Sequence, residues 1–156
     1  MSNFEDILNN ISPEEKHPND RVLLIDGLNI FLRAFAVNGS LNEKGVPVGG
    51  IMGFMKSLAF AIREMDPTRV VVVYDGAGGS KRRRKINPNY KSQRVPKRVT
   101  KFDAFNSLED EKEAMKIQFR RLLSYLDLLP IDVYSVDHVE ADDVIAYIAQ
   151  NVLENE

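Results

Sequence analysis

The chain has 156 residues, 44% hydrophobic and 28% charged, with a net charge of −2, which suits one globular domain with a buried core. It has no cysteine, so thiolate metal sites are excluded, and two histidines disfavour a histidine-rich zinc site. Carboxylates, which favour Mg²⁺ or Mn²⁺, remain as metal ligands. No apolar run approaches the ~18 residues of a membrane span, and the start lacks a secretory pattern, so we expect a cytoplasmic protein without membrane contacts.

Residues 1–20 are polar, carry two prolines, and are interpreted as a leader before a domain over residues 21–156. Three apolar runs follow in that domain, at residues 22–25, 70–74 and 131–136. Uninterrupted apolar runs of this length are typical of strands buried on both faces, as in parallel sheets. We therefore expect three strands at these positions.

Apolar residues recur at helical spacing between and after these strands. The periodic stretches span residues 52–62, 115–126 and 144–152. Ser107 is the expected cap of the second helix, because the acids at 109–111 would face the positive end of its dipole. The alternation of strands and helices predicts an α/β fold with a mostly parallel sheet.

Acidic residues follow each predicted strand. Asp26 ends the first and Asp75 the second, while Glu140, Asp142 and Asp143 follow the third and open the last helix. In open α/β sheets the functional crevice lies outside the carboxyl ends of the strands. Carboxylates gathered there repel one another, and a cation compensates. Two ions about 4 Å apart could activate a water and stabilise the leaving oxygen of a phosphodiester.

Each of these acidic motifs also has a simpler interpretation. An Asp-Gly pair after a strand is more often a turn than a metal ligand. The acids that open the last helix could serve only as capping and dipole compensation. Their occurrence at three successive strand ends favours the metal site.

The segment from Lys81 to Lys101 holds ten basic residues and no acid, whereas the rest of the chain holds 11 basic and 23 acidic residues, a balance of −12. This uneven distribution of charge predicts a surface that binds a polyanion. The alternative is a basic loop that is simply exposed to solvent. We expect the basic side chains to follow the phosphate backbone without reading sequence; they are Lys81, Arg82, Arg83, Arg84, Lys85, Lys97 and Arg98.

Several stretches resemble the 5′-nuclease family, which includes bacteriophage 5′-exonucleases of the flap-endonuclease and ribonuclease H type and the 5′-nuclease domain of bacterial DNA polymerase I. The stretches are L-L-I-D-G-L-N-I-F at 23–31, G-V-P-V-G-G-I-M-G-F at 45–54, V-V-V-Y-D-G at 71–76, N-Y-K-S-Q-R at 89–94 and V-E-A-D-D-V-I-A at 139–146. The likeness covers roughly residues 21–150. The phage branch is most similar, because the basic insertion is short.

The resemblance implies a PIN-like fold with a basic helical arch, at about residues 76–106, inserted after the second strand. It makes the five acids metal ligands, some direct and some through water. It also implies that Lys91 and Arg94 approach the scissile phosphate and that Tyr90 stacks on a base; a packed aromatic is the alternative for Tyr90. Asn87 and Pro88 are the expected cap and first residue of the arch helix.

In this family a further strand brings a second aspartate cluster, and a helix-hairpin-helix follows. The sequence stops at Glu156, so we expect a fold truncated before its later strands. The resemblance then implies a two-metal Mg²⁺ or Mn²⁺ site completed by residues absent from this chain. A separate polypeptide carrying the C-terminal nuclease half is the expected partner.

The expected function is Mg²⁺-dependent 5′→3′ exonuclease or flap-endonuclease cleavage of DNA, or of RNA in RNA–DNA hybrids, during replication or repair. The expected substrates carry 5′ ends or flaps, and the chain alone should be incomplete or inactive. The alternative is a non-catalytic nucleic-acid-binding or assembly module. A small-molecule α/β enzyme is disfavoured, because no glycine-rich phosphate loop follows the first strand.

Overall fold

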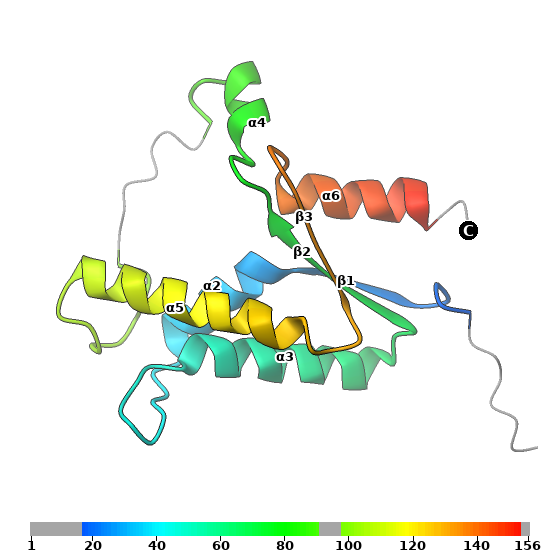
Figure 1. Ribbon diagram of the computed structural model, residues 1–156. Coiled ribbons are helices and arrows are strands. Elements are labelled where there is room, and N and C mark those ends of the chain that lie inside the picture. Colours follow the sequence, from blue (N-terminus) through cyan, green and yellow to red (C-terminus); the bar gives the residue numbers. More distant parts are fainter. Residues whose placement is uncertain (1–16, 91–97, 154–156) are drawn as a thin grey trace, which may run out of the picture.

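Three strands form a parallel sheet in the order β1-β2-β3, and they are β1 (Val22–Asp26), β2 (Arg69–Asp75) and β3 (Asp132–Val136). Figure 1 shows this sheet in the computed structural model, which describes residues 17–90 and 98–153. All three strands coincide with the predicted apolar runs to within a few residues. Their carboxyl ends lie at one edge of the sheet because the strands are parallel.

The central strand β2 is buried on both faces. Val70, Val72 and Tyr74 belong to one hydrophobic cluster, while Val71 and Val73 belong to another. Successive side chains of a strand point to opposite faces, so an unbroken apolar run supplies both cores. The prediction of two buried faces is confirmed for β2. It is wrong for β3, which has no buried residue and exposes Tyr134 and Val136.

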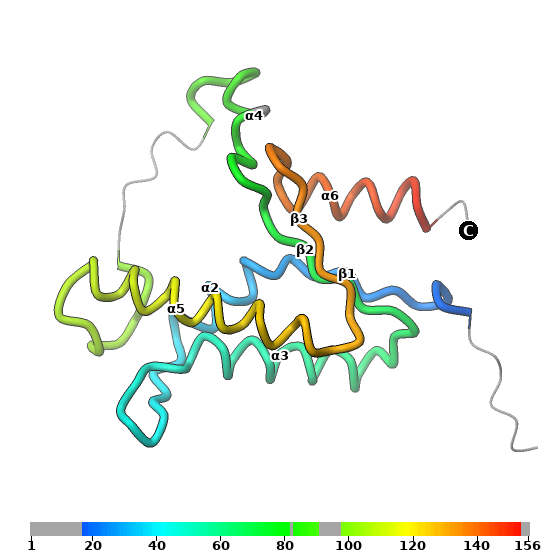
Figure 2. Tube along the Cα trace, in the orientation of Figure 1, coloured from blue at the N-terminus to red at the C-terminus, as the bar shows by residue number. Residues whose placement is uncertain are grey.

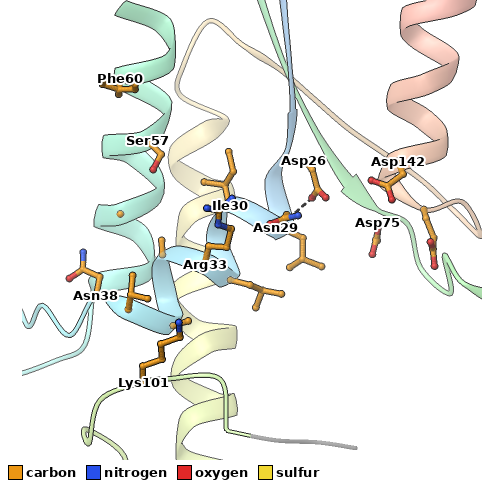
Figure 3. Close-up of a pocket in the computed structure, with 17 residues that line it drawn as sticks. Asp26, Asn29, Ile30, Arg33, Asn38, Ser57, Phe60, Asp75, Lys101 and Asp142 are labelled. Atoms are coloured by element: carbon orange, nitrogen blue, oxygen red, sulfur yellow. Dashed lines mark hydrogen bonds between the residues drawn. The ribbon is translucent and has the colours of Figure 1, made fainter. Parts of the chain in front are cut away.

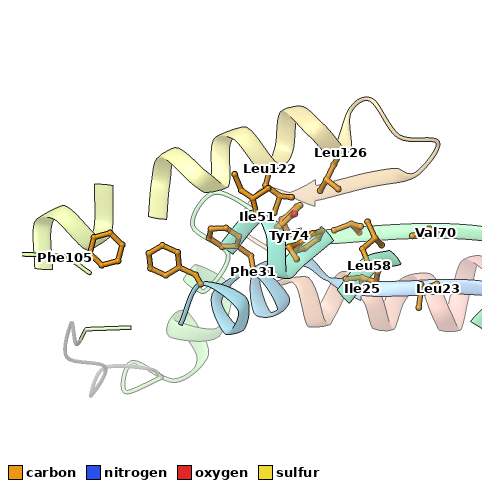
Figure 4. Close-up of a cluster of buried hydrophobic side chains, with 13 residues drawn as sticks. Leu23, Ile25, Phe31, Ile51, Leu58, Val70, Tyr74, Phe105, Leu122 and Leu126 are labelled. Atoms are coloured by element: carbon orange, nitrogen blue, oxygen red, sulfur yellow. The ribbon is translucent and has the colours of Figure 1, made fainter. Parts of the chain in front are cut away.

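The larger core lies between the sheet and three helices, α2 (Gly27–Val37), α3 (Gly49–Met65) and α5 (Leu108–Leu126). Figure 4 shows its side chains, among which Phe31 and Leu122 are fully buried. None of the described helices is long and apolar enough to cross a membrane.

The opposite face of the sheet is covered by α6 (Ala141–Tyr147), which continues into a wider π-helical turn, η1 (Ile148–Val152). Figure 2 follows the trace along this face. A short helix, α4 (Lys81–Ile86), leaves the end of β2 and stands apart from the helices that cover the sheet (Figure 1). The chain is thus layered around the sheet, with basic α4 projecting beyond the carboxyl ends of its strands.

Side chains fix the starts of the two long helices, α3 and α5. Ser107 accepts a hydrogen bond from the Asp110 N–H at 3.0 Å, so the predicted cap of α5 is confirmed. At the start of α3, the buried Gln118 side chain accepts from the N–H groups of Gly50 at 2.9 Å and Ile51 at 3.4 Å. One oxygen of α5 therefore satisfies two backbone donors that α3 leaves open.

Two described helices, α2 and α4, were not expected as separate elements. Only the first residue of α2, Gly27, was interpreted, as part of the Asp-Gly motif, yet Phe31, Ala34 and Phe35 place a buried stripe at helical spacing. Asn87 ends α4, and its side chain accepts from the Asn89 N–H at 3.1 Å. Pro88, the expected first residue of the arch helix, lies in a turn over residues 88–90 instead. Beyond Tyr90, the expected arch helix lies outside the described residues.

Candidate active site

Four of the five predicted acids line one cavity of about 1310 Å³ at the carboxyl ends of the strands. Figure 3 shows Asp26, Asp75 and Asp142 grouped at one side of this cavity, and Glu140 also lines it. The fifth acid, Asp143, is not in the cavity wall and pairs with Arg83. The sheet therefore brings together acids that lie up to more than a hundred residues apart in sequence.

Asp26 and Asp75 each use one carboxylate oxygen to fix the start of a helix. Asp26 Oδ1 accepts from the Asn29 N–H at 2.9 Å and caps α2. Asp75 Oδ1 accepts from the Ala141 N–H at 2.8 Å and so ties the end of β2 to the start of α6. Capping and a place in the cavity wall occur together, so the simpler interpretation of the Asp-Gly pairs does not exclude the functional one.

The glycine after each aspartate is required by close packing. A Cβ on Gly27 would lie 2.5 Å from ring carbons of Tyr74, and a Cβ on Gly76 would overlap the carbonyl oxygen of Val136. Tyr74 is buried, and its hydroxyl has no hydrogen-bond partner within the described part of the chain. Burial, with a smaller contribution from the charge of Asp26, raises the pKa of Tyr74 well above its usual value.

Arg83 of α4 lies between two of the acids. Its Nη1 is 3.0 Å from Glu140 Oε2, and its Nη2 is 2.7 Å from Asp143 Oδ1. Tyr90 Oη accepts from Arg83 Nη1 at 2.9 Å and donates to Glu140 Oε2 at 2.9 Å. The hydrogen bonds to Asp143 and then to Tyr90 raise the pKa of Arg83 above its usual value.

The donor set suits a hard divalent cation, because carboxylate oxygens are the ligands that Mg²⁺ and Mn²⁺ prefer. Nevertheless, no group of three or more His, Cys, Asp or Glu side chains is placed to hold a metal ion among residues 17–90 and 98–153. Glu140 is only 4% exposed, and the positive charge beside it comes from Arg83. The metal-ligand roles of the five acids stay a prediction.

The other side of the cavity is lined by two cations, Arg33 of α2 and Lys101 (Figure 3). Neither makes an ion pair or a side-chain hydrogen bond with any described residue. Neither was singled out from the sequence. Asn29 and Arg33 are four residues apart on α2 and both line the cavity, which is the helical signal that could have identified Arg33.

The remaining basic side chains divide into three groups. Lys81, Arg84 and Lys85 are exposed on α4. Arg98 is exposed but is bonded to the Phe105 carbonyl at 2.6 Å, Asp103 at 3.2 Å and Glu111 at 3.5 Å, so a nucleic-acid contact there would have to share this network. The side chain of Arg82 and the residues Lys91, Arg94 and Lys97 lie outside the described part.

Tyr90 is half-buried and bonded on two sides, which agrees with the packed alternative for this residue. The Arg83 guanidinium carbon also lies 5.6 Å from the centre of its ring. Stacking of Tyr90 on a base stays a prediction.

Curated relatives match most of this chain. Thermostable DNA polymerase I of Thermus aquaticus is 34% identical over 134 residues, which cover 85% of this chain and 14% of the relative. A 5′-3′ exonuclease of Aquifex aeolicus is 33% identical over 128 residues, 81% of this chain and 39% of the relative. The chain therefore spans well under half the length of these relatives.

Solved structures agree on the fold. A bacteriophage T5 protein crystallized with metal ions has a TM-score of 0.55 and 20% identity, over 85% of this chain and 45% of that one. The T5 flap endonuclease in a complex with DNA and metal ions has a TM-score of 0.51 and 18% identity, over 86% and 45%. The PIN-like fold is confirmed by these likenesses together with the parallel sheet.

The family whose sequence pattern matches residues 21–156 is described as 5′-3′ exonuclease, N-terminal resolvase-like domain. The match includes all three strands and all the acids of the cavity. The chain thus belongs to the 5′-3′ exonuclease family, of which it carries the N-terminal resolvase-like domain.

Proposed function

We propose that this chain takes part in metal-dependent hydrolysis of phosphodiester bonds in DNA, as a 5′-nuclease. The supporting observation is a cavity with acids from three strand ends at one side and, at the other, two cations that pair with no acid in the described part of the chain. Such a cavity can hold a polyanionic strand by its phosphates while placing one phosphate beside the acids. The residues concerned are Asp26, Asp75, Glu140, Asp142, Arg33 and Lys101.

The acids would hold the divalent ion, for which Mg²⁺ is the proposed identity. When bound, such an ion supplies charge stabilisation and a lowered pKa for an attacking water. Asp26 and Asp75 suit this role because each keeps one carboxylate oxygen that no described hydrogen bond uses. Arg33 and Lys101 would position the strand through its phosphates, without reading its sequence.

The proposed substrates are DNA with 5′ ends or flaps, and the RNA strand of RNA–DNA hybrids is included in the proposal. Since no described group of three acids is placed as metal ligands, we propose that further carboxylates complete a two-ion site. A second polypeptide that carries the C-terminal half of the nuclease would supply them. Efficient turnover then depends on that polypeptide.

A second candidate is a nucleic-acid-binding module without catalysis. The observation that favours it is the ion pair of Arg83 with Glu140 and Asp143, which neutralises acids that a nuclease needs for metal. The same cavity would then bind a strand and leave it intact.

Cleavage of a 5′-labelled flap duplex with Mg²⁺ or Mn²⁺ separates the two candidates. We expect metal-dependent cleavage, slower than about 1 s⁻¹ for the chain alone, that is lost in Asp75→Asn. The matched control is Asp137→Asn, an exposed acid near the same sheet edge that does not line the cavity and should leave cleavage unchanged. Binding of the duplex without any cleavage would favour the second candidate and overturn the first.

A further inference from the structure

The Arg83 guanidinium takes the place at Glu140 and Asp143 that a bound cation would take. It contacts one oxygen of each acid, at 3.0 and 2.7 Å, and Tyr90 holds both Arg83 and Glu140 through its hydroxyl. A buried carboxylate is costly unless it is paired and hydrogen-bonded. Arg83 and Tyr90 supply this compensation for Glu140, which is 4% exposed.

This pairing is specific to Arg83 among the described basic side chains of α4. Lys81, Arg84 and Lys85 belong to the same short helix and are exposed, and they pair with no described acid. The contact therefore depends on the position of Arg83, since the general positive charge of the helix is shared by all five of its basic residues. A guanidinium can contact two carboxylates at once because it presents several N–H donors in a fixed plane.

The pairing is also placed where it can open. The side chain of Arg83 is 32% exposed and that of Asp143 is 44% exposed, so water can reach the ion pair from outside. Helix α4 stands apart from α2, α3 and α5, and it follows the end of β2 (Figure 1). Release of Arg83 need not disturb either hydrophobic core, because neither core includes a residue of α4.

We propose that Arg83 is a tethered counter-cation that competes with the divalent metal ion for Glu140 and Asp143 and passes to a phosphate of the nucleic acid when the metal displaces it. This inference rests on the proposed function. It makes metal binding and strand binding mutually reinforcing, since each removes one partner from the ion pair. Without metal, Arg83 stays paired with Glu140 and Asp143, so it is not available to bind a phosphate of the nucleic acid.

Titration of the whole 156-residue chain with Mn²⁺ by calorimetry tests the competition. Arg83→Gln should bind Mn²⁺ about tenfold more tightly than the wild type, a change typical of coupled sites. Arg84→Gln makes the same charge change on the same helix and should leave Mn²⁺ affinity unchanged. Arg83→Lys keeps the charge but loses the planar pair of donors. Its Mn²⁺ affinity should therefore lie between that of the wild type and that of Arg83→Gln.

Anisotropy of a labelled single-stranded oligonucleotide, in EDTA and in Ca²⁺, tests the exchange of partners. The wild type should bind more tightly in Ca²⁺ than in EDTA by a factor larger than that of Arg83→Gln. Arg84→Gln should lose the same factor of affinity in both solutions. An equal gain on adding Ca²⁺ for the wild type and Arg83→Gln would overturn the exchange.

The failures of the inference and of the proposed function differ. If Asp75→Asn abolishes the Mn²⁺ heat but Arg83→Gln binds like the wild type, the metal site stands and the competition is wrong. If neither the wild type nor Arg83→Gln binds Mn²⁺, both are wrong. Mn²⁺ binding by Arg83→Gln alone would be the strongest form of support, because it would mean that the guanidinium blocks the site.

Discussion

Two glutamates of this chain are almost fully buried beside an arginine, and their surroundings differ. Glu111, in the first turn of α5, is 2% exposed and accepts from the Val99 N–H at 2.5 Å and the Thr100 hydroxyl at 2.9 Å. Glu140, at the start of α6, is 4% exposed, lines the cavity, and is held by Arg83 and Tyr90. Burial and an arginine partner are common to both.

The difference lies in what can replace the partners. Two of the partners of Glu111 are a backbone N–H and a hydroxyl of the adjoining segment, and these bonds anchor that segment to α5. Glu140 is paired with a side chain from a projecting helix and opens on a cavity that other acids share. A buried acid thus indicates structure when it anchors the backbone of an adjoining segment, and function when it lines a cavity beside a side chain that can be exchanged.

The largest effect is expected for Glu111→Gln, which should lower the free energy of unfolding by about 3 kcal/mol. The uncharged glutamine side chain cannot make the charge-assisted hydrogen bonds of the carboxylate. It would leave the Val99 N–H or the Thr100 hydroxyl without a full hydrogen bond in a buried site. Urea denaturation followed by circular dichroism would measure the loss. A loss no larger than that of an exposed acid would mean that Glu111 does not anchor the segment.

The same change at the other glutamate, Glu140→Gln, should cost less stability, about 1 kcal/mol or below. Arg83 keeps Asp143 as a partner at 2.7 Å, and removing a desolvated charge offsets part of the loss. Mn²⁺ affinity should nevertheless fall at least tenfold, whereas Glu111→Gln should retain it. Urea denaturation and Mn²⁺ calorimetry of both variants test this: Glu111→Gln should lose mainly stability, and Glu140→Gln mainly metal affinity. Equal stability losses would contradict the difference between the two glutamates.

A third buried polar group, the Tyr74 hydroxyl, has no partner among the described residues, so removing it should stabilise the protein. Tyr74→Phe should raise the free energy of unfolding by about 1 kcal/mol near neutral pH. Because burial raises the pKa of Tyr74, the folded chain keeps a proton that the unfolded chain loses near pH 10. The advantage of the variant should therefore grow above about pH 10, as denaturation at neutral and alkaline pH would reveal.

The smallest effect is expected at the exposed end of the Glu111 network. Asp103 pairs with Arg98 at 3.2 Å, but its side chain is 95% exposed. Asp103→Asn should change the free energy of unfolding by less than about 0.5 kcal/mol, because solvent screens exposed pairs. A larger loss in the same urea titration would extend the structural network to the surface.

The sequence indicated those parts of the fold that depend on local pattern. Apolar runs marked the three strands, and Ser107 marked the start of α5. The acids of the cavity were found because carboxyl ends of parallel strands meet at one edge. The helix α2 was not expected because its cap Asp26 and first residue Gly27 form the Asp-Gly motif, which was interpreted only as a strand end.

Contacts between distant residues could not be found in this way. Nothing local indicates that Arg83 meets Glu140, 57 positions later, or that Gln118 reaches the start of α3. Glu111 was interpreted only as an acid at the positive end of the α5 dipole, although it also anchors Val99 and Thr100. Pairing of this kind depends on the packed fold rather than on spacing.

The bond from Gln118 to the start of α3 has a consequence for synthesis. The Gly50 N–H and the Gln118 oxygen are 68 residues apart, and at a translation rate of about 5–20 residues per second this gap lasts roughly 3–14 s. In the later part of that time α2 and α3 are complete without α5, and the apolar faces that contact it are uncovered. The apolar faces of α2 and α3 in the nascent chain therefore stay exposed until the ribosome has synthesised α5, which covers them.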